Sequence, residues 1–165
     1  MDELVELLEY RDGKLYWKVD IGSKVKAGDR AGTTVGKAAP YRAVRYKGSK
    51  YYEHRIIYYM FNKYLPEQID HIDGDPSHNC IKNLRPATGQ QNQRNKCSKE
   101  GASSKFKGVS WNKYHKKWVS RVWGGKSSKH LGLYKCEIEA AKAYDKRASE
   151  LFGEYARPNF PEDFK

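Results

Sequence analysis

The stretch Ile69-Asp70-His71-Ile72-Asp73-Gly74-Asp75 decides the fold, because it ends a short apolar run and enters a turn rich in Gly and Asp. Within it, Asp70 and His71 place a carboxylate directly beside an imidazole. A carboxylate can hold a metal ion and an imidazole can act as a general base, so the two groups complement each other. The stretch therefore indicates a chemical role.

Two asparagines follow this stretch. Asn83 stands in Asn83-Leu84-Arg85-Pro86, and Asn92 comes nine residues later in a run rich in Gln and Asn. Thr88 can cap a short helix, which puts Asn92 one turn further along and facing the preceding hairpin. We expect two strands and a helix to converge on one point.

Asp70-His71, Asn83 and Asn92 resemble the HNH (ββα-metal, His-Me finger) nuclease motif of phage-type and homing endonucleases. The resemblance implies that His71 is the general base, that Asn83 braces the loop between the strands, and that Asp70 and Asn92 are the metal ligands. The third position is Asn rather than His. Two oxygen ligands suit a hard cation, so we expect Mg²⁺, with Mn²⁺ as a substitute.

Three other interpretations of this part of the chain stay open or fail. Asp-Gly-Asp-Pro is also typical of a solvated turn. A calcium loop of the EF-hand type fails, because Ile72 falls at a position that needs an oxygen ligand. A zinc site built from Cys80, Cys97 and His78 is the weaker metal alternative.

The composition points to a polyanionic partner. The chain has 165 residues, a net charge of +12 and a pI near 9.5, which favours nucleic acid as that partner. No apolar run approaches the roughly 20 residues that span a bilayer, so we expect no membrane partner. The acidic start Met1-Asp2-Glu3-Leu4 is unlike a secretory signal. We expect a cytoplasmic protein, in the host cytoplasm if a phage encodes it.

The first half of the chain has a mixed pattern of helices and strands. The spacing of apolar residues predicts a helix over 2–10, a strand over 15–19, a hairpin of strands 41–46 and 50–53, and a buried helix over 54–64. Residues 22–37 are rich in Gly, Ala and Lys and indicate an irregular connection or a weak hairpin. We expect His54 to be structural or to face a phosphate.

The character of the sequence changes after a small, polar stretch at 97–104. From Gly101 to Cys136 there is no acidic residue and there are nine basic ones. Alternating patterns predict strands at 106–111, 117–123 and 129–134, with turns at 112–116 and 124–128. A helix over 137–152 follows, with an apolar stripe of Ile138, Ala141, Tyr144, Ala148 and Leu151. We expect one sheet face to cover the helix and the other to be basic and exposed.

This second half resembles the Apetala (ethylene-response-factor) type of DNA-binding domain over residues 103–161. The matching segments include Phe-Lys-Gly-Val-Ser-Trp at 106–111 and Glu-Ala-Ala-Lys-Ala-Tyr-Asp at 139–145. Ser110 and Trp123 stand where plant members commonly use Arg, so their target sequence does not transfer. The resemblance and the charge pattern imply DNA contacts from the sheet, and we add two arginines of the first half. The predicted DNA-binding residues are Lys105, Lys107, Trp111, Lys113, Lys116, Trp118, Arg121, Trp123, Arg85 and Arg94.

The sequence thus predicts an α+β protein with two modules. An HNH nuclease domain spans 1–96, a linker 97–104, and a DNA-binding domain with a three-stranded antiparallel sheet packed on one helix spans 105–165. The predicted function is metal-dependent cleavage of double-stranded DNA by a monomer or homodimer, with targeting by the second module. The alternative is a non-catalytic DNA-binding regulator with a vestigial nuclease domain. An RNA-binding protein ranks lower, because no RNA-recognition or KH signature is present.

Overall fold

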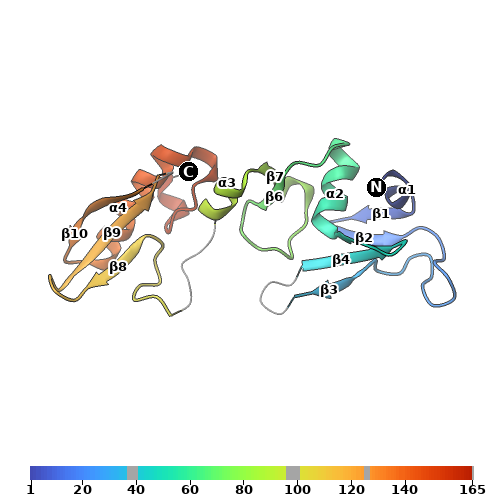
Figure 1. Ribbon diagram of the computed structural model, residues 1–165, viewed down its shortest axis with the longest axis horizontal. Helices are drawn as coiled ribbons and strands as arrows, with labels where there is room; N and C mark the ends of the chain where they lie inside the picture. The colour runs from blue at the N-terminus through green and yellow to red at the C-terminus, as the bar shows by residue number, and fades with distance from the viewer. Residues whose placement is uncertain (37–40, 96–100, 125–126, 165) are drawn as a thin grey trace. The chain divides into compact units, whose positions relative to one another are not determined.

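The computed structural model describes residues 1–36, 41–95, 101–124 and 127–164 (Figure 1). They form two compact units, Met1–Thr88 and Gly89–Lys165. Both units combine short helices with small antiparallel sheets. In the described part of the chain, no helix has the length and apolar character needed to cross a membrane.

The first unit contains three separate antiparallel sheets, ordered β1-β2, β3-β4-β5 and β6-β7. The helix α2 follows β5 directly and precedes the β6-β7 hairpin. The elements are α1 (Asp2–Glu6), β1 (Leu8–Arg11), β2 (Lys14–Trp17), β3 (Thr33–Val35), β4 (Tyr41–Tyr46), β5 (Ser49–Tyr52), α2 (Glu53–Asn62), β6 (Gln68–His71), the 3-10 helix η1 (Ile81–Asn83) and β7 (Leu84–Ala87).

The first helix is shorter than the sequence predicts. It ends at Glu6, and the chain continues as strand β1, which pairs with β2 around Asp12 and Gly13. Both turn residues have positive φ, 45° and 79°, as a tight two-residue hairpin requires. A Cβ at Gly13 would lie only 2.8 Å from the backbone N of Cys80. The hairpin therefore packs closely behind the loop between β6 and β7.

The core of the first unit gathers around α2. Ile56, Ile57 and Tyr58 are buried, together with Leu8 and Leu15 of the N-terminal hairpin. The sequence predicts burial all around this helix, but Phe61 is 52% exposed. The helix is therefore buried on one side, and its first residue, Glu53, is buried as well.

The second unit contains one three-stranded antiparallel sheet, ordered β10-β9-β8. The helix α4 packs against β9 and β10, as the orange and red ribbons of Figure 1 show. The elements are α3 (Gly89–Arg94), β8 (Val109–Asn112), β9 (Lys117–Trp123), β10 (Ser128–Tyr134), α4 (Glu137–Phe152) and the 3-10 helices η2 (Gly153–Tyr155) and η3 (Pro161–Phe164).

The helix α4 buries a different stripe from the one that the sequence predicts. Ala140, Ala141, Tyr144 and Ala148 are buried, whereas Ile138, one of the expected core residues, is 49% exposed. Small alanines allow helix and sheet to approach closely, so the stripe is centred on them. Leu151, also expected in the core, is exposed.

Some predicted features fall on residues outside the described ones. Residues 97–100 of the predicted linker, Lys37 of the irregular connection, and residues 125 and 126 of the predicted turn are among them. The predicted domain limits stay a prediction.

Candidate active site and nucleic-acid interface

The hairpin of β6 and β7 carries the first two predicted site residues. In its register Asp70 lies opposite Arg85, and His71 opposite Leu84. Both Asp70 and His71 are buried, with 3% and 6% of their surface exposed. The long loop between the strands is tied at its base by the backbone bond from Ile72 N to Asn83 O, 2.9 Å.

The side chain of Asn83 holds the loop in place. Its Oδ1 accepts a hydrogen bond from Asp73 N at 3.1 Å, and its Nδ2 donates to Asp73 Oδ1 at 2.9 Å and to His78 O at 2.8 Å. Asn83 is 9% exposed, whereas Asp73 and His78 are exposed residues of the loop. The contacts are those that a brace needs, while its part in catalysis stays a prediction.

A buried polar chain runs from His71 to Glu53 through Asn79. His71 Nε2 lies 2.8 Å from Asn79 Oδ1, and Asn79 Nδ2 donates to Glu53 Oε2 at 3.0 Å. Glu53 Oε1 accepts from Leu15 N at 3.1 Å and from Arg30 Nη1 at 2.5 Å. Glu53 and Asn79 are each 2% exposed. The sequence analysis did not identify either residue. The available signal was Glu53, at the first position of a strongly apolar helix.

This series of hydrogen bonds determines which nitrogen of His71 carries the proton in the neutral ring. A carboxylate oxygen only accepts hydrogen bonds, so Glu53 fixes the Asn79 amide with its NH₂ toward the carboxylate. Asn79 Oδ1 is then an acceptor facing His71, and His71 Nε2 must be the donor. The lone pair of the neutral imidazole is therefore on Nδ1.

His54 lies beside His71, with 5.3 Å between the ring centroids. Burial, with smaller contributions from the charges of His71 and Arg55, lowers the pKa of His54 to about 3. The rings of Tyr41 and Tyr52 also pack against His54. The residue is therefore neutral near pH 7 and has the surroundings of a structural group, as the sequence leads us to expect.

The predicted metal ligand Asp70 is oriented by Arg85. Its Oδ2 accepts from Arg85 Nε at 2.9 Å and from Arg85 Nη2 at 2.7 Å. Arg85, predicted to contact DNA, is itself only 8% exposed. A carboxylate and an amide oxygen are donors that fit Mg²⁺ or Mn²⁺, which bind through few protein ligands and retain water.

The predicted metal ligands Asn92 and Cys97 belong to other parts of the chain than the β6-β7 hairpin. Asn92 lies in α3, in the second unit, so its place beside Asp70 stays a prediction. Cys97 of the alternative zinc site lies outside the described residues. Among the described residues, no group of three or more His, Cys, Asp and Glu side chains is placed to hold a metal ion.

The sheet of the second unit divides the predicted DNA contacts between its two faces. Arg121 and Trp123, two residues apart on β9, are exposed, and Val122 between them is buried. Trp118 packs on the core cluster of Val109 and is register partner of Trp111, 5.0 Å away by ring centroid. The remaining predicted contacts on this unit include exposed lysines, Lys105, Lys113 and Lys116. The outward face of β9 thus combines the cationic Arg121 with the exposed indole of Trp123.

The comparison with known families agrees with the hairpin geometry. A family model described as HNH endonuclease matches residues 51–94, which include Glu53, the hairpin and Asn92. The chain belongs to the HNH endonuclease family. An uncharacterized HNH endonuclease, L560, of Acanthamoeba polyphaga mimivirus is 39% identical over 122 residues, which cover 70% of this chain and 61% of that protein.

Two further relatives are each similar to part of this chain. Protein 3.8 of Escherichia phage T7 is 32% identical over 89 residues, covering 54% of this chain and 73% of that protein. The dehydration-responsive element-binding protein 2E of Arabidopsis thaliana is 39% identical over 80 residues, covering 42% of this chain and 32% of that protein. The chain thus belongs to the HNH family and is also similar to a plant protein whose name refers to binding a DNA element.

Proposed function

We propose that this HNH family member is a metal-dependent endonuclease that hydrolyses phosphodiester bonds in double-stranded DNA. The buried hydrogen bonds from Glu53 through Asn79 to His71 support the proposal, because they leave His71 Nδ1 as the ring nitrogen that can accept a proton. A group held by buried partners is preorganised for one reaction geometry.

In the proposed reaction, His71 Nδ1 accepts a proton from the water that attacks the scissile phosphate. Asn79 accepts from His71 Nε2 throughout and stabilises the imidazolium that forms. Asn83 keeps the loop in position, and Asp70 and Asn92 would hold the cation. A divalent cation supplies, when bound, charge stabilisation for the leaving 3′ oxygen. The expected products carry 5′-phosphate and 3′-hydroxyl ends.

The second module is proposed to direct the nuclease to its DNA target. Its exposed Arg121 and Trp123 support this role, as does the charge of +12 on the whole chain. The proposal includes a ββα-metal arrangement of β6, β7 and α3, and the domain limits 1–96 and 105–165. One chain has one such site, so a monomer nicks one strand per encounter and a homodimer could cut both. The proposed location is the cytoplasm of a host cell.

The test is incubation of supercoiled plasmid with the full chain in Mg²⁺, in Mn²⁺ and in EDTA. We expect relaxed or linear plasmid with either metal ion and intact plasmid in EDTA. Unchanged plasmid in both metal ions, from a protein that binds the same plasmid, would instead support a non-catalytic DNA-binding regulator. The ion pair between Arg85 and Asp70 favours that alternative, since the guanidinium occupies an oxygen of the proposed ligand.

A further inference from the structure

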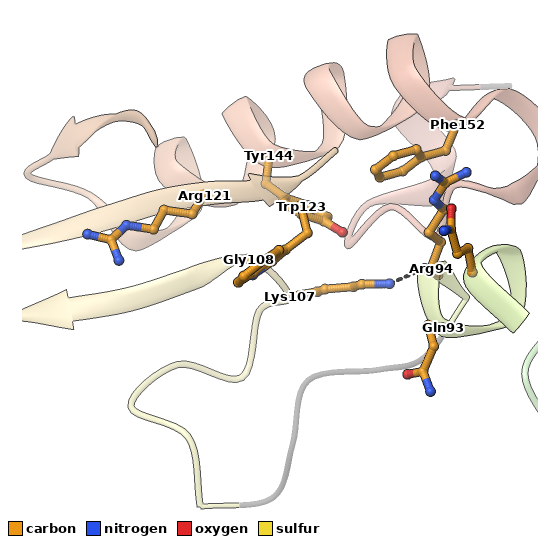
Figure 2. Close-up of a pocket in the computed structure, with 9 residues that line it drawn as sticks. Gln93, Arg94, Lys107, Gly108, Arg121, Trp123, Tyr144 and Phe152 are labelled. Atoms are coloured by element: carbon orange, nitrogen blue, oxygen red, sulfur yellow. Dashed lines mark hydrogen bonds between the residues drawn. The ribbon is translucent and has the colours of Figure 1, made fainter. Parts of the chain in front are cut away.

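A pocket of about 530 Å³ opens in the second unit beside α3, the helix that also carries the proposed metal ligand Asn92 (Figure 2). It is formed by α3, by the segment entering β8, by the end of β9 and by α4. Its volume falls within the range of about 300–1,000 Å³ that is usual for small-molecule sites. Arg121 and Trp123, which the proposed function assigns to DNA targeting, are part of its lining, so the pocket borders the proposed duplex-binding surface.

The walls of the pocket combine positive charge with aromatic rings. Arg94, Lys107 and Arg121 line it, and no Asp or Glu is among its described lining residues. Trp123 is 67% exposed, and the guanidinium of Arg94 lies over the ring of Phe152, 4.5 Å from its centroid. Figure 2 shows Trp123 between Arg121 and Lys107. Such a site favours a ligand with a planar ring and a negative charge.

The floor of the pocket is rigid. Gly108, with a φ of 75°, packs so closely on α4 that a Cβ there would lie 2.0 Å from Tyr144 Cδ2. The neighbouring Lys107 N donates to Asn159 Oδ1 at 2.7 Å, and Asn159 Nδ2 donates in turn to Lys107 O at 3.2 Å and to the fully buried Asp145 at 2.8 Å. The pocket is therefore preformed, so its lining residues lose little conformational entropy when a ligand binds.

The position of Lys107 suits an anion. Its ammonium donates to the carbonyl oxygen of Arg94, which brings the two cationic side chains to the same wall. An ammonium has three N–H donors, so this bond is compatible with a further contact to a phosphate. The indole of Trp123 is within the same pocket and offers a face for stacking.

We propose that this pocket binds a single unpaired nucleotide, with the base stacked on Trp123 and the phosphate held by Lys107 and Arg94. A base inside a duplex is stacked on both sides and cannot enter a pocket unless it leaves the helix. The ligand is therefore a nucleotide at a bulge, a strand end or a gap, or a free mononucleotide. The inference rests on the proposed function in taking DNA as the partner, and it adds a preference for unpaired positions.

The test measures binding by the full chain in EDTA, so that no DNA is cut. Fluorescence anisotropy compares a fully paired duplex with the same duplex carrying one bulged nucleotide, with and without 2′-deoxyadenosine 5′-monophosphate as competitor. The variants are Trp123→Leu and, as a matched control, Tyr114→Leu, which removes an exposed aromatic ring outside the pocket. Thermal melting verifies that each variant folds.

We expect the unaltered protein to bind the bulged duplex about tenfold more tightly than the paired one, as stacking of one base allows. Trp123→Leu should abolish this preference, and Tyr114→Leu should keep it. Competition by the mononucleotide, lost in Trp123→Leu, would identify the free nucleotide as a second source of the ligand. Without any preference or competition, or with the same response in both variants, the proposal is overturned. Failure to bind the paired duplex would count against the proposed function instead.

Discussion

The two units place their functional polar groups in opposite environments. In the first unit Glu53, Asn79, His71 and Asn83 are all below 10% exposure and bonded to one another or to the backbone. In the second unit Arg121 and Trp123 point outward and are exposed. A base must be held in one orientation, whereas a phosphate-binding cation must be reachable. In the proposed function, this difference separates reaction from recognition within one small chain.

The largest expected effect tests the buried side of this comparison. His71→Ala removes the proposed base, and general-base catalysis contributes about 10²–10⁴-fold to rate. Cleavage should therefore fall at least about a hundredfold, with DNA affinity retained, in a plasmid assay run beside a binding assay. The control is His130→Ala, which removes an exposed imidazole on β10. Cleavage by His71→Ala near the original rate would remove His71 from the reaction.

The next prediction concerns Asn79, which touches neither DNA nor metal in the proposal. Asn79→Ala deletes the acceptor for His71 Nε2, so kcat should fall about ten- to a hundredfold through misorientation, with KM nearly unchanged. Steady-state kinetics separate the two constants. Asn62→Ala is the control, because Asn62 lies on α2 and bonds only the carbonyl of Tyr58 among the contacts described. A raised KM with normal kcat would contradict a positioning role.

The exposed side of the comparison predicts a smaller, salt-dependent effect. Arg121→Gln and Lys113→Gln each remove one cation from the proposed DNA-binding surface. If each contacts one phosphate, the slope of log K against log salt becomes shallower by about 0.9 per substitution. Binding titrations at several salt concentrations measure the slope. Lys146→Gln on α4 removes another exposed cation and should leave the slope unchanged. If none of the three substitutions changes the slope, the sheet does not contact the phosphate backbone of DNA.

The smallest effect is on stability and comes from His54. Its pKa in the folded protein is about 3, below the unfolded value near 6.5, so between these values the unfolded chain binds more protons. The free energy of unfolding should therefore fall as pH drops below 6.5, by up to about 2 kcal/mol at pH 5. Urea unfolding across pH should show a flatter profile for His54→Asn than for His115→Asn, an exposed control. Identical profiles would contradict the burial of His54.

The sequence predicted local features of the site better than distant ones. Asp70, His71 and Asn83 belong to one hairpin and its loop, so their spacing along the chain is sufficient to bring them together. Glu53 and Asn79 are 26 residues apart in sequence and meet only through the fold, so no short pattern indicates their contact. Their catalytic and positioning roles stay predictions.

The fold was predicted in class but not in detail. The N-terminal apolar residues fit both a helix and a strand, and the Asp12-Gly13 turn decided for β1 and β2 over a continued helix. In α4 the helical period was predicted, but the sheet selects which residues it covers. The sheet covers Ala140 and leaves Ile138 exposed, because close packing of helix and sheet favours the smaller side chain.

The carboxylate of Glu53 has a consequence for transplanting the nuclease into other proteins. Its two oxygens join Leu15, Arg30 and Asn79, at separations of 38, 23 and 26 residues from Glu53. The segment that matches the family model begins at residue 51 and so excludes Leu15 and Arg30. A graft of residues 51–94 alone would carry Glu53 without two of its three partners. A portable cassette for genome engineering would have to include the N-terminal hairpin and the segment that follows it.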